Sequence, residues 1–338
     1  MNNQHEPMKR REFLTKATQT AAVAAIGGRT ALATVEDNTD PASPNASGTQ
    51  KKPLIQIGIL LGTFRSGTLE ARLDAVKAAG IDAVQLSMDC AGLSMMPDAI
   101  APELAQQIRR AAAERDIKLA SVAGTFNMCH PDAEHRQTGL RRLRVLAAAC
   151  SQLGISKIHL CTGTRDRTSM WRRHPDNDTP EAWRDMVACV REACDIARQS
   201  RVVLAFEPEV NNVVDSAKQA RRLMDEIGSP FLKVTLDAAN LFPAGKLPQM
   251  KEILDEAFAL IGKDIVLAHA KDLDHDGDAG HLAAGQGKLD YDRYIALLHK
   301  YRFPGPLLLH SLSEAQVPGC VAFLREKIAR LASPPAKK

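Results

Sequence analysis

From Leu54 onward, short runs of β-branched or leucine-rich residues alternate with polar loops and longer amphipathic segments. Apolar residues recur every three to four positions in the longer segments, which predicts helices, whereas the short continuous runs are typical of buried strands. Eight strands are predicted, over residues 54–61, 83–88, 119–124, 157–162, 202–208, 232–237, 265–272 and 306–311. Eight helices are predicted, over residues 69–79, 102–114, 139–153, 180–199, 217–227, 249–261, 291–301 and 317–331.

Alternating strand and helix units of this kind require right-handed crossovers and a parallel sheet. Eight units in about 280 residues have the number and size of a (β/α)8 TIM barrel, so we predict a single α/β barrel over residues 53–332. An open, doubly wound sheet is the alternative. It is less favoured because it rarely uses eight regular units and because no glycine-rich dinucleotide fingerprint follows the first strand.

The first 33 residues have the pattern of a targeting segment. Lys9-Arg10-Arg11-Glu12-Phe13-Leu14-Thr15-Lys16 precedes a short run of small apolar residues and then Ala31-Leu32-Ala33. This resembles a twin-arginine export signal cleaved before Thr34. The alternative is a basic amphipathic helix that the mature protein retains. From the motif we expect the twin-arginine machinery as a partner and a periplasmic location. The apolar run is too short to cross a bilayer, so we expect no stable membrane anchor.

The segments that flank the predicted barrel differ from it in composition. Residues 34–52 are rich in Pro, Ser, Asn, Thr and Asp, which is typical of a flexible linker, and residues 333–338 are expected to be a disordered tail. The net charge of +4 comes from the ends of the chain, because residues 53–332 contain 35 basic and 35 acidic residues. A balanced surface with only 4% aromatic residues argues against a nucleic-acid partner.

Seven cysteines form an odd number, contain no Cys-x-x-Cys pair and lie mostly inside apolar runs. This pattern indicates reduced core residues rather than a disulfide framework or a structural zinc site.

Four of the predicted strands end in residues that bind metals. Strands five to eight close on Glu207, Asp237, His269 and His310. The chemistry of a TIM barrel lies where strands end, and a buried carboxylate is costly unless it is paired or coordinates a cation. Any one of these residues alone is explained equally well by an internal ion pair or a satisfied core histidine. Together the four predict a divalent metal site with oxygen and imidazole ligands.

The same segments carry a family resemblance. LAFEPE at 204–209, VTLDAAN at 234–240, LAHAKD at 267–272 and FPGPLLLH at 303–310 resemble the xylose isomerase-like TIM barrel superfamily, in particular sugar phosphate isomerase/epimerase proteins. GQGKLD at 285–290 is similar to the family's loop between strands seven and eight. The resemblance covers about residues 54–331. It implies a carbohydrate substrate, a divalent metal held by Glu, Asp, His and Glu, and proton transfer by the two glutamates.

Carried over to this chain, the ligands implied are Glu207, Asp237 and His269, and His310 stands where the family has its last glutamate. This ligand set has a formal charge of −2 instead of −3, and the additional imidazole favours Mn²⁺ foremost, then Co²⁺, Fe²⁺ or Zn²⁺, over Mg²⁺. Glu207 remains as one proton carrier. The second would be His310, Glu314 or a residue of an earlier loop.

Further residues are candidates for contact with the substrate. Lys271 shares a strand face with His269 and would steady an enediolate or pair with Asp272. The substrate-binding candidates are His130, Arg165, Trp171, Glu209 and Asn240. For each, an ordinary role in loop packing or turn formation is the alternative. The run Asp272, Asp274, Asp276 and Asp278 lacks the glutamate of an EF-hand, so we expect a solvated loop.

The first of the following three functions is the one that we predict, and the other two are alternatives. The first is a metal-dependent sugar isomerase or epimerase that moves a proton next to a polarised carbonyl. The second is a lyase or hydrolase acting on oxidised (keto) glycosides, for which one base suffices. The third is a non-catalytic sugar-binding barrel. A homo-oligomer is compatible with all three.

Overall fold

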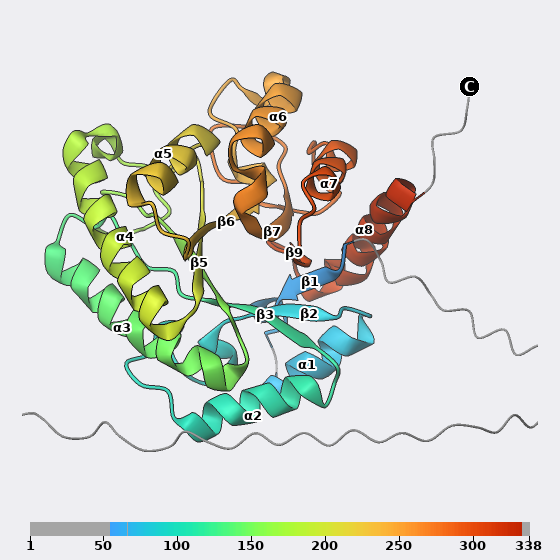
Figure 1. Ribbon diagram of the computed structural model, residues 1–338. Coiled ribbons are helices and arrows are strands. Elements are labelled where there is room, and N and C mark those ends of the chain that lie inside the picture. Colours follow the sequence, from blue (N-terminus) through green and yellow to red (C-terminus); the bar gives the residue numbers. More distant parts are fainter. Residues whose placement is uncertain (1–54, 66, 333–338) are drawn as a thin grey trace, which may run out of the picture. The chain divides into compact units, whose positions relative to one another are not determined.

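The computed structural model describes residues 55–65 and 67–332 (Figure 1). The expected signal at residues 1–33, the linker at 34–52 and the tail at 333–338 lie outside the described residues, so these expectations stay predictions. Within the described residues, no helix is long and apolar enough to cross a membrane.

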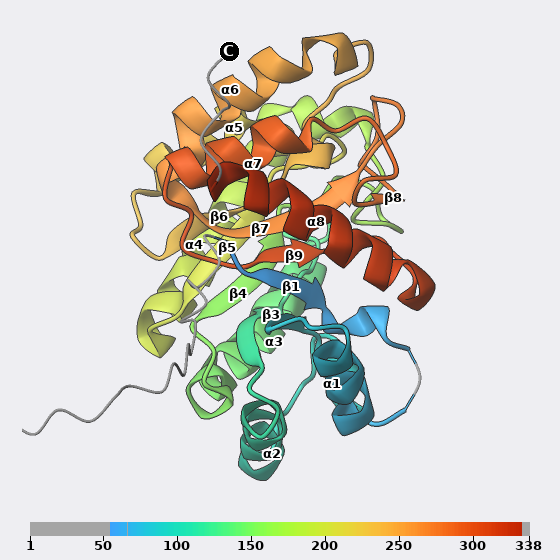
Figure 2. The same cartoon turned by 90° about the vertical axis from the view of Figure 1, so that its right-hand side faces the viewer.

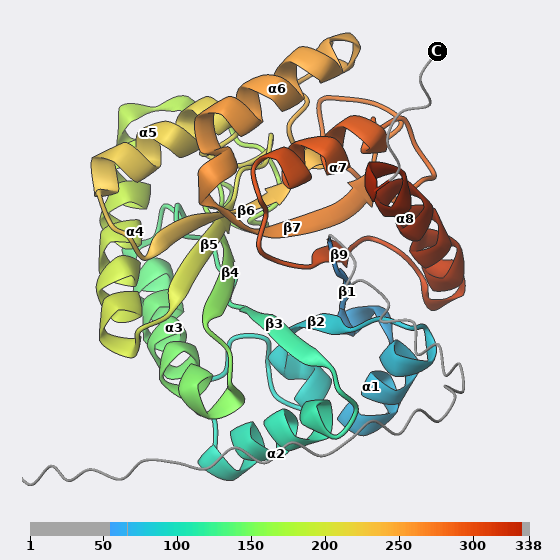
Figure 3. The ribbon, with the colours of Figure 1, turned by 45° about the vertical axis from the view of Figure 1, so that its right-hand side comes forward.

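Eight parallel strands close into a barrel, as the sequence predicts (Figure 3). The barrel strands are β1 (Ile57–Leu60), β2 (Ala83–Leu86), β3 (Lys118–Ala123), β4 (Lys157–Cys161), β5 (Val203–Glu207), β6 (Leu232–Asp237), β7 (Ile265–Asp272) and β9 (Leu307–Leu309). Each strand pairs with its neighbour, and β9 pairs with both β7 and β1, which closes the ring. The additional strand β8 (Leu282–Ala283) lies in the loop after β7 and pairs antiparallel with its end.

Helices surround this barrel (Figures 1 and 2). They are α1 (Leu69–Ala78), α2 (Pro102–Ala113), α3 (Ala133–Leu153), α4 (Pro180–Ser200), α5 (Ala217–Ile227), α6 (Met250–Ile261), α7 (Tyr291–Lys300) and α8 (Val317–Ala332). Short 3-10 turns occur at Leu61–Thr63, Met88–Ala91, Pro175–Asp178, Ala238–Asn240, Leu247–Gln249, Gly262–Asp264 and Glu314–Gln316.

Helix α3 begins six residues earlier than the sequence pattern predicts. The side chain of Asp132 accepts a hydrogen bond from the backbone N–H of Glu134 and caps the helix. Residues 133–138 are largely exposed and therefore show no apolar periodicity. Gly139 lies inside the helix, where it makes room for the ring of Phe126, because a Cβ at this position would stand 2.0 Å from that ring.

The interior of the barrel below the strand ends is a small apolar plug. Ala205, Leu267 and Leu308 pack together there and are fully buried. Gly58 leaves space for Leu308, since a Cβ at Gly58 would lie 2.6 Å from the Leu308 Cδ2 atom. These side chains fill part of the barrel interior with apolar groups.

All seven cysteines are buried and none of them forms a disulfide. Burial raises the pKa of the thiols of Cys129, Cys150 and Cys189 to about 12. The expectation of reduced core cysteines agrees with this arrangement.

Candidate active site

A cavity of about 750 Å³ opens at the carboxyl ends of the barrel strands. Glu207, Asn240, His269, Lys271 and His310 line it. Asp237 lies beside them and is completely buried. The strand register explains this grouping: Asp237 is level with His269 across β6 and β7, and His310 directly follows Leu309, which is level with Ala270.

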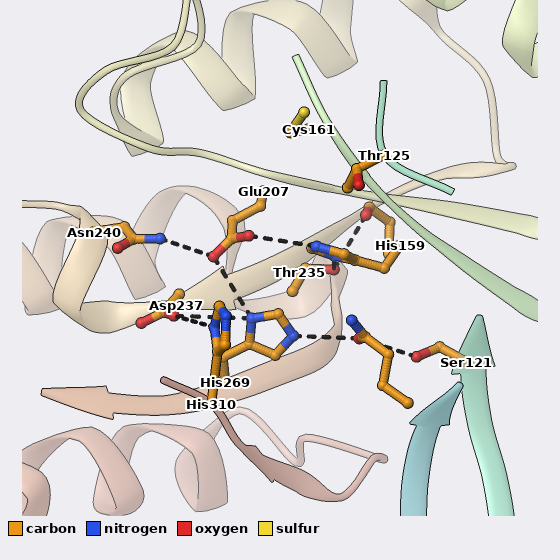
Figure 4. Close-up of polar contacts among 12 residues, drawn as sticks. Ser121, Thr125, His159, Cys161, Glu207, Thr235, Asp237, Asn240, His269 and His310 are labelled. Atoms are coloured by element: carbon orange, nitrogen blue, oxygen red, sulfur yellow. Dashed lines mark hydrogen bonds and ion pairs between the residues drawn. The ribbon is translucent and has the colours of Figure 1, made fainter. Parts of the chain in front are cut away.

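Asp237, His269 and His310 bring three ligand atoms together (Figure 4). The Asp237 Oδ2 atom lies 3.5 Å from His310 Nδ1 and 3.8 Å from His269 Nδ1. All three atoms are buried and make no hydrogen bond. Buried polar atoms are normally hydrogen-bonded, so three ligand atoms that face one another without hydrogen bonds favour a shared partner. Two ligands that each lie about 2.1 Å from one ion stand about 3.0–3.5 Å apart, which is close to the spacing here.

Glu207 is the fourth residue of this group. Its Oε1 atom accepts a hydrogen bond of 2.9 Å from the Asn240 side-chain amide and lies 3.6 Å from His269 Nδ1. Burial opposes ionisation of this carboxyl, but the neighbouring His269 imidazole holds its pKa below its ordinary value. Glu207 therefore presents a carboxylate to the cavity and to the same imidazole that faces Asp237.

Lys271 supplies a cation next to these carboxylates. Its Nζ atom lies 3.3 Å from Asp237 Oδ2. Burial by itself would disfavour the charges, but the Lys271 ammonium holds the pKa of Asp237 well below its usual range. In turn, Asp237 and Glu207 raise the pKa of Lys271 above its ordinary value. The pair is therefore ionised, and the expectation that Lys271 pairs with Asp272 is wrong.

Two buried side chains hold His269 in place. His269 Nε2 lies 3.3 Å from Gln85 Oε1, and the Ser121 hydroxyl donates to the same oxygen over 3.2 Å. Both residues come from the opposite side of the barrel, on β2 and β3.

His159 lies on the other side of Glu207. Its Nε2 atom is 3.5 Å from Glu207 Oε2, and its Nδ1 atom is 3.0 Å from Thr235 Oγ1. The Thr235 hydroxyl donates to the carbonyl of Ala205, so its oxygen accepts the His159 Nδ1–H. Burial lowers the pKa of His159 to about 3. His159 is therefore a neutral imidazole beside the carboxyl group of Glu207.

Glu209 lines the same cavity and is 4% exposed. Its Oε1 atom is buried without a hydrogen-bond partner. Burial, reinforced by the charge of Glu207, raises the pKa of Glu209 to about 8. Glu207 and Glu209, two residues apart on one segment, thus have their pKa values displaced in opposite directions.

A scan against protein families matches residues 73–327 to the xylose isomerase-like TIM barrel family. The chain belongs to this family. A curated relative from Actinoplanes sp., 2-epi-5-epi-valiolone 7-phosphate 2-epimerase, is 30% identical over 177 residues, or 52% of this chain and 58% of the relative. This chain thus spans little more than half of the length of that relative.

Solved structures with the same fold include further epimerases. The 3-keto-D-glucoside 4-epimerase from E. coli superposes with a TM-score of 0.63 and 15% identity, over 80% of this chain and 99% of that one. A D-tagatose 3-epimerase-like protein superposes with a TM-score of 0.67 and 14% identity, over 82% and 98%. At sequence identities this low, the similarity shows only that these proteins and this chain share the barrel fold.

Within the xylose isomerase-like barrel, the structure brings most sequence candidates to one cavity. Glu207, His269, His310, Lys271, Glu209, Asn240 and Trp171 all line it. Arg165 does not reach it. Its guanidinium donates to Asp185 and to the carbonyl of Cys129 instead. His130 lines a neighbouring cavity, and Glu314 lies at the exposed rim, where it accepts a hydrogen bond from the Arg65 backbone N–H.

Sequence reasoning missed two residues of the site, Gln85 and His159. Both lie inside strands, whereas the predicted site residues stand at strand ends or in loops. The available signal was a polar side chain inside an otherwise apolar strand, in AVQL of β2 and KIHLC of β4.

The aspartate run after β7 is only partly solvated. Asp272 is 1% exposed and accepts hydrogen bonds from three backbone N–H groups, so the expectation of a solvated loop is wrong for this residue. Asp274 is exposed and forms an exposed group with His275 and His281.

Proposed function

We propose that this protein is a divalent-metal-dependent sugar epimerase or isomerase. The observation that carries the proposal is the convergence of three buried ligand atoms without hydrogen bonds, Asp237 Oδ2, His269 Nδ1 and His310 Nδ1, beside a cavity that Glu207 also lines. The epimerase names of the relatives agree with a sugar substrate.

Asp237, His269 and His310, with Glu207 as the fourth ligand, are the residues that would hold the ion. Two imidazoles and two carboxylates suit Mn²⁺ foremost, with Co²⁺, Fe²⁺, Zn²⁺ or Mg²⁺ as alternatives. A bound divalent ion supplies a Lewis acid that polarises a carbonyl of the sugar and thereby acidifies the adjacent C–H.

The chain itself supplies the proton carriers. Glu207, held by the Asn240 side-chain amide, takes the proton from the carbon next to the carbonyl. Glu209 lines the same cavity with a free carboxyl oxygen and is placed to act on the substrate as a second acid or base. Lys271 keeps an ammonium beside Asp237, where it stabilises negative charge that develops on a substrate oxygen.

A lyase or hydrolase acting on a keto glycoside is the second candidate. The observation that favours it is His310, a partly buried imidazole, at the place where the resemblance implies a glutamate. Removing a proton next to a carbonyl and expelling a β-substituent needs only one base, which Glu207 provides. Elimination products separate this candidate from an epimerase, and a lack of any turnover would favour a sugar-binding protein.

The test is solvent exchange in D₂O. Manganese-loaded protein is incubated with a panel of ketoses and keto glycosides, and NMR follows deuterium incorporation next to the carbonyl. We expect incorporation by the wild type, a loss of at least about 100-fold in Glu207→Gln and no change in the matched rim variant Glu314→Gln. Incorporation that persists in Glu207→Gln would exclude its role as the base. Metal content is measured in the same samples and in Asp237→Asn, which should lose the ion.

We also propose that the chain is exported folded by the twin-arginine route. The support is the Arg10-Arg11 motif with the small-residue run that follows it. Replacing both arginines with lysine should retain the protein in the cytoplasm on cell fractionation, and unchanged export would refute this route.

A further inference from the structure

A second cavity, of about 660 Å³, adjoins the first. Three residues, Met95, Thr125 and Met170, line both cavities and form their shared wall. The central cavity faces the ligand atoms of β5 to β7, whereas the second cavity extends toward the start of α3 and the loop after β4. The second cavity is therefore next to the space at Glu207, across these three side chains.

The second cavity combines an apolar side with balanced polar groups. Phe126 and Met96 contribute the apolar side. Two of its charged groups are already paired: Arg142 binds Asp98, and Asp166 binds Arg172 and accepts from the backbone N–H groups of Thr168 and Ser169. The hydroxyl and amide groups beside them, on Thr125, Asn127 and Thr138, favour a ligand that forms hydrogen bonds.

Two stacked imidazoles form part of this cavity. The rings of His130 and His135 are 3.9 Å apart and inclined by 17°. His130 is buried and fixed by hydrogen bonds with the Asp132 backbone N–H and the Arg167 carbonyl, whereas His135 is exposed. A fixed flat surface next to hydrogen-bonding groups suits a sugar ring, which has apolar faces and a polar edge.

The exposed apolar side chains of the protein also lie at these two cavities. Among the residues that the structure describes, Met95 and Trp171 are the large hydrophobic side chains that remain exposed, at 38% and 42%. Both line the central cavity, and Met95 belongs to the shared wall. Exposed apolar groups collected at the mouth of one cavity indicate a binding surface larger than the reacting centre.

From this geometry we propose that the second cavity is a subsite for a second sugar ring, so that the ligand of this protein is a glycoside of at least two rings. One ring lies at Glu207 and the other lies between Phe126 and the stacked histidines. The assignment of the reacting ring rests on the proposed function, but the existence of the subsite does not. His130 would then contact the substrate, as the sequence suggests, through the second ring.

Binding measurements test the subsite without any turnover. Isothermal titration of the manganese-loaded protein compares D-glucose and D-galactose with cellobiose, maltose and lactose, and with phenyl β-D-glucoside. We expect at least one disaccharide to bind 10-fold or more tightly than its monosaccharide. If no disaccharide gains over its monosaccharide, the subsite is refuted. If only the phenyl glucoside gains, the cavity takes an aromatic aglycone and the assignment to a sugar is wrong.

Variants on α3 test whether the second sugar ring binds in the second cavity. Thr138 lines the second cavity, whereas its neighbour Gln137 is exposed and contacts Glu192. Thr138→Trp should remove the advantage of the disaccharide and leave monosaccharide binding unchanged, while Gln137→Trp should preserve both. His135→Ala, at an exposed position, should weaken disaccharide binding by 3-fold or more and serves if Thr138→Trp does not fold.

Disaccharide binding that neither variant alters would overturn the proposal, even if Glu207→Gln abolishes proton exchange. A failure of exchange in the wild type would leave this binding test intact.

Discussion

The Nε2 atom of His269 lies 3.3 Å from the side-chain oxygen of Gln85, an acceptor that carries no proton. A neutral His269 must therefore carry its own proton on Nε2, which leaves Nδ1 as a lone pair directed toward Asp237 and Glu207. Gln85 thus selects the tautomer of His269 that can bind a metal, although it lies on a distant strand.

Replacing Gln85 with leucine should weaken metal binding. Without the amide oxygen, His269 loses the contact that orients its ring and fixes its tautomer, and losses of this kind typically reduce metal affinity by about 10- to 100-fold. Competitive titration of Mn²⁺ or Zn²⁺ with a chromophoric chelator measures the change. Ser121→Ala, which removes only the hydrogen bond to Gln85, should have a smaller effect. An unchanged affinity in Gln85→Leu would show that His269 is not a ligand.

Replacing His310 with glutamate should change the preference among metals. The substitution changes the formal charge of the ligand set from −2 to −3 and exchanges an imidazole for a hard oxygen ligand. We expect the affinity ratio of Zn²⁺ to Mg²⁺ to fall by about 10-fold or more. Paired titrations of wild type and variant measure it. If the ratio stays the same, His310 does not coordinate the ion.

The stability of the metal-free protein should depend on pH through Glu209. Its pKa is raised to about 8 in the folded protein, above the ordinary value of 4.5. Between these values the unfolded chain has lost this proton and the folded chain still holds it, so the contribution of Glu209 to the free energy of unfolding falls as pH rises and levels off above pH 8. Urea unfolding in a chelating buffer should show Glu209→Gln gaining stability relative to wild type from pH 5 to pH 8. A constant difference between the two would contradict the raised pKa.

Removing the carboxylate of Asp272 should destabilise the barrel. Asp272 Oδ1 accepts from the backbone N–H groups of Leu273 and Leu289, and Oδ2 accepts from Gly285. Asp272→Ala leaves these groups unsatisfied, at a cost on the order of 3–5 kcal/mol. Urea denaturation measures it. The exposed Asp274→Ala is the control and should change stability by less than about 0.5 kcal/mol. Equal effects of the two substitutions would show that the Asp272 contacts contribute nothing specific.

Much of the fold could be predicted because each unit repeats the same pattern. The apolar runs that form β5, β6 and β7 read as strands by themselves, and eight such units imply closure. The first turns of α3 could not be predicted from periodicity because they bury almost nothing, although Asp132 was a capping signal. Strand β8 has two residues, and its pairing with Lys271 and Asp272 depends on the path of the loop.

The site could be predicted in part for a similar reason. Glu207, Asp237, His269 and His310 stand at strand ends, and the barrel brings strand ends together whatever their distance in the sequence. Gln85 and His159 could not be assigned partners, because their contacts cross the barrel and depend on strand register. The position of Arg165 was set by Asp185 on a neighbouring helix, a contact without a local sequence signal.

Labelling of the buried cysteines can report local unfolding of this protein. Thiol alkylation and disulfide exchange proceed through the thiolate, and thiols whose pKa is raised to about 12 by burial, such as Cys129 and Cys150, are almost entirely protonated at pH 7. Reaction therefore requires a local opening of the structure that exposes the sulfur atom to solvent. Cys150 lies in α3, Cys189 and Cys194 lie in α4, and Cys320 lies in α8. The order in which these thiols are labelled would therefore show which helix opens first.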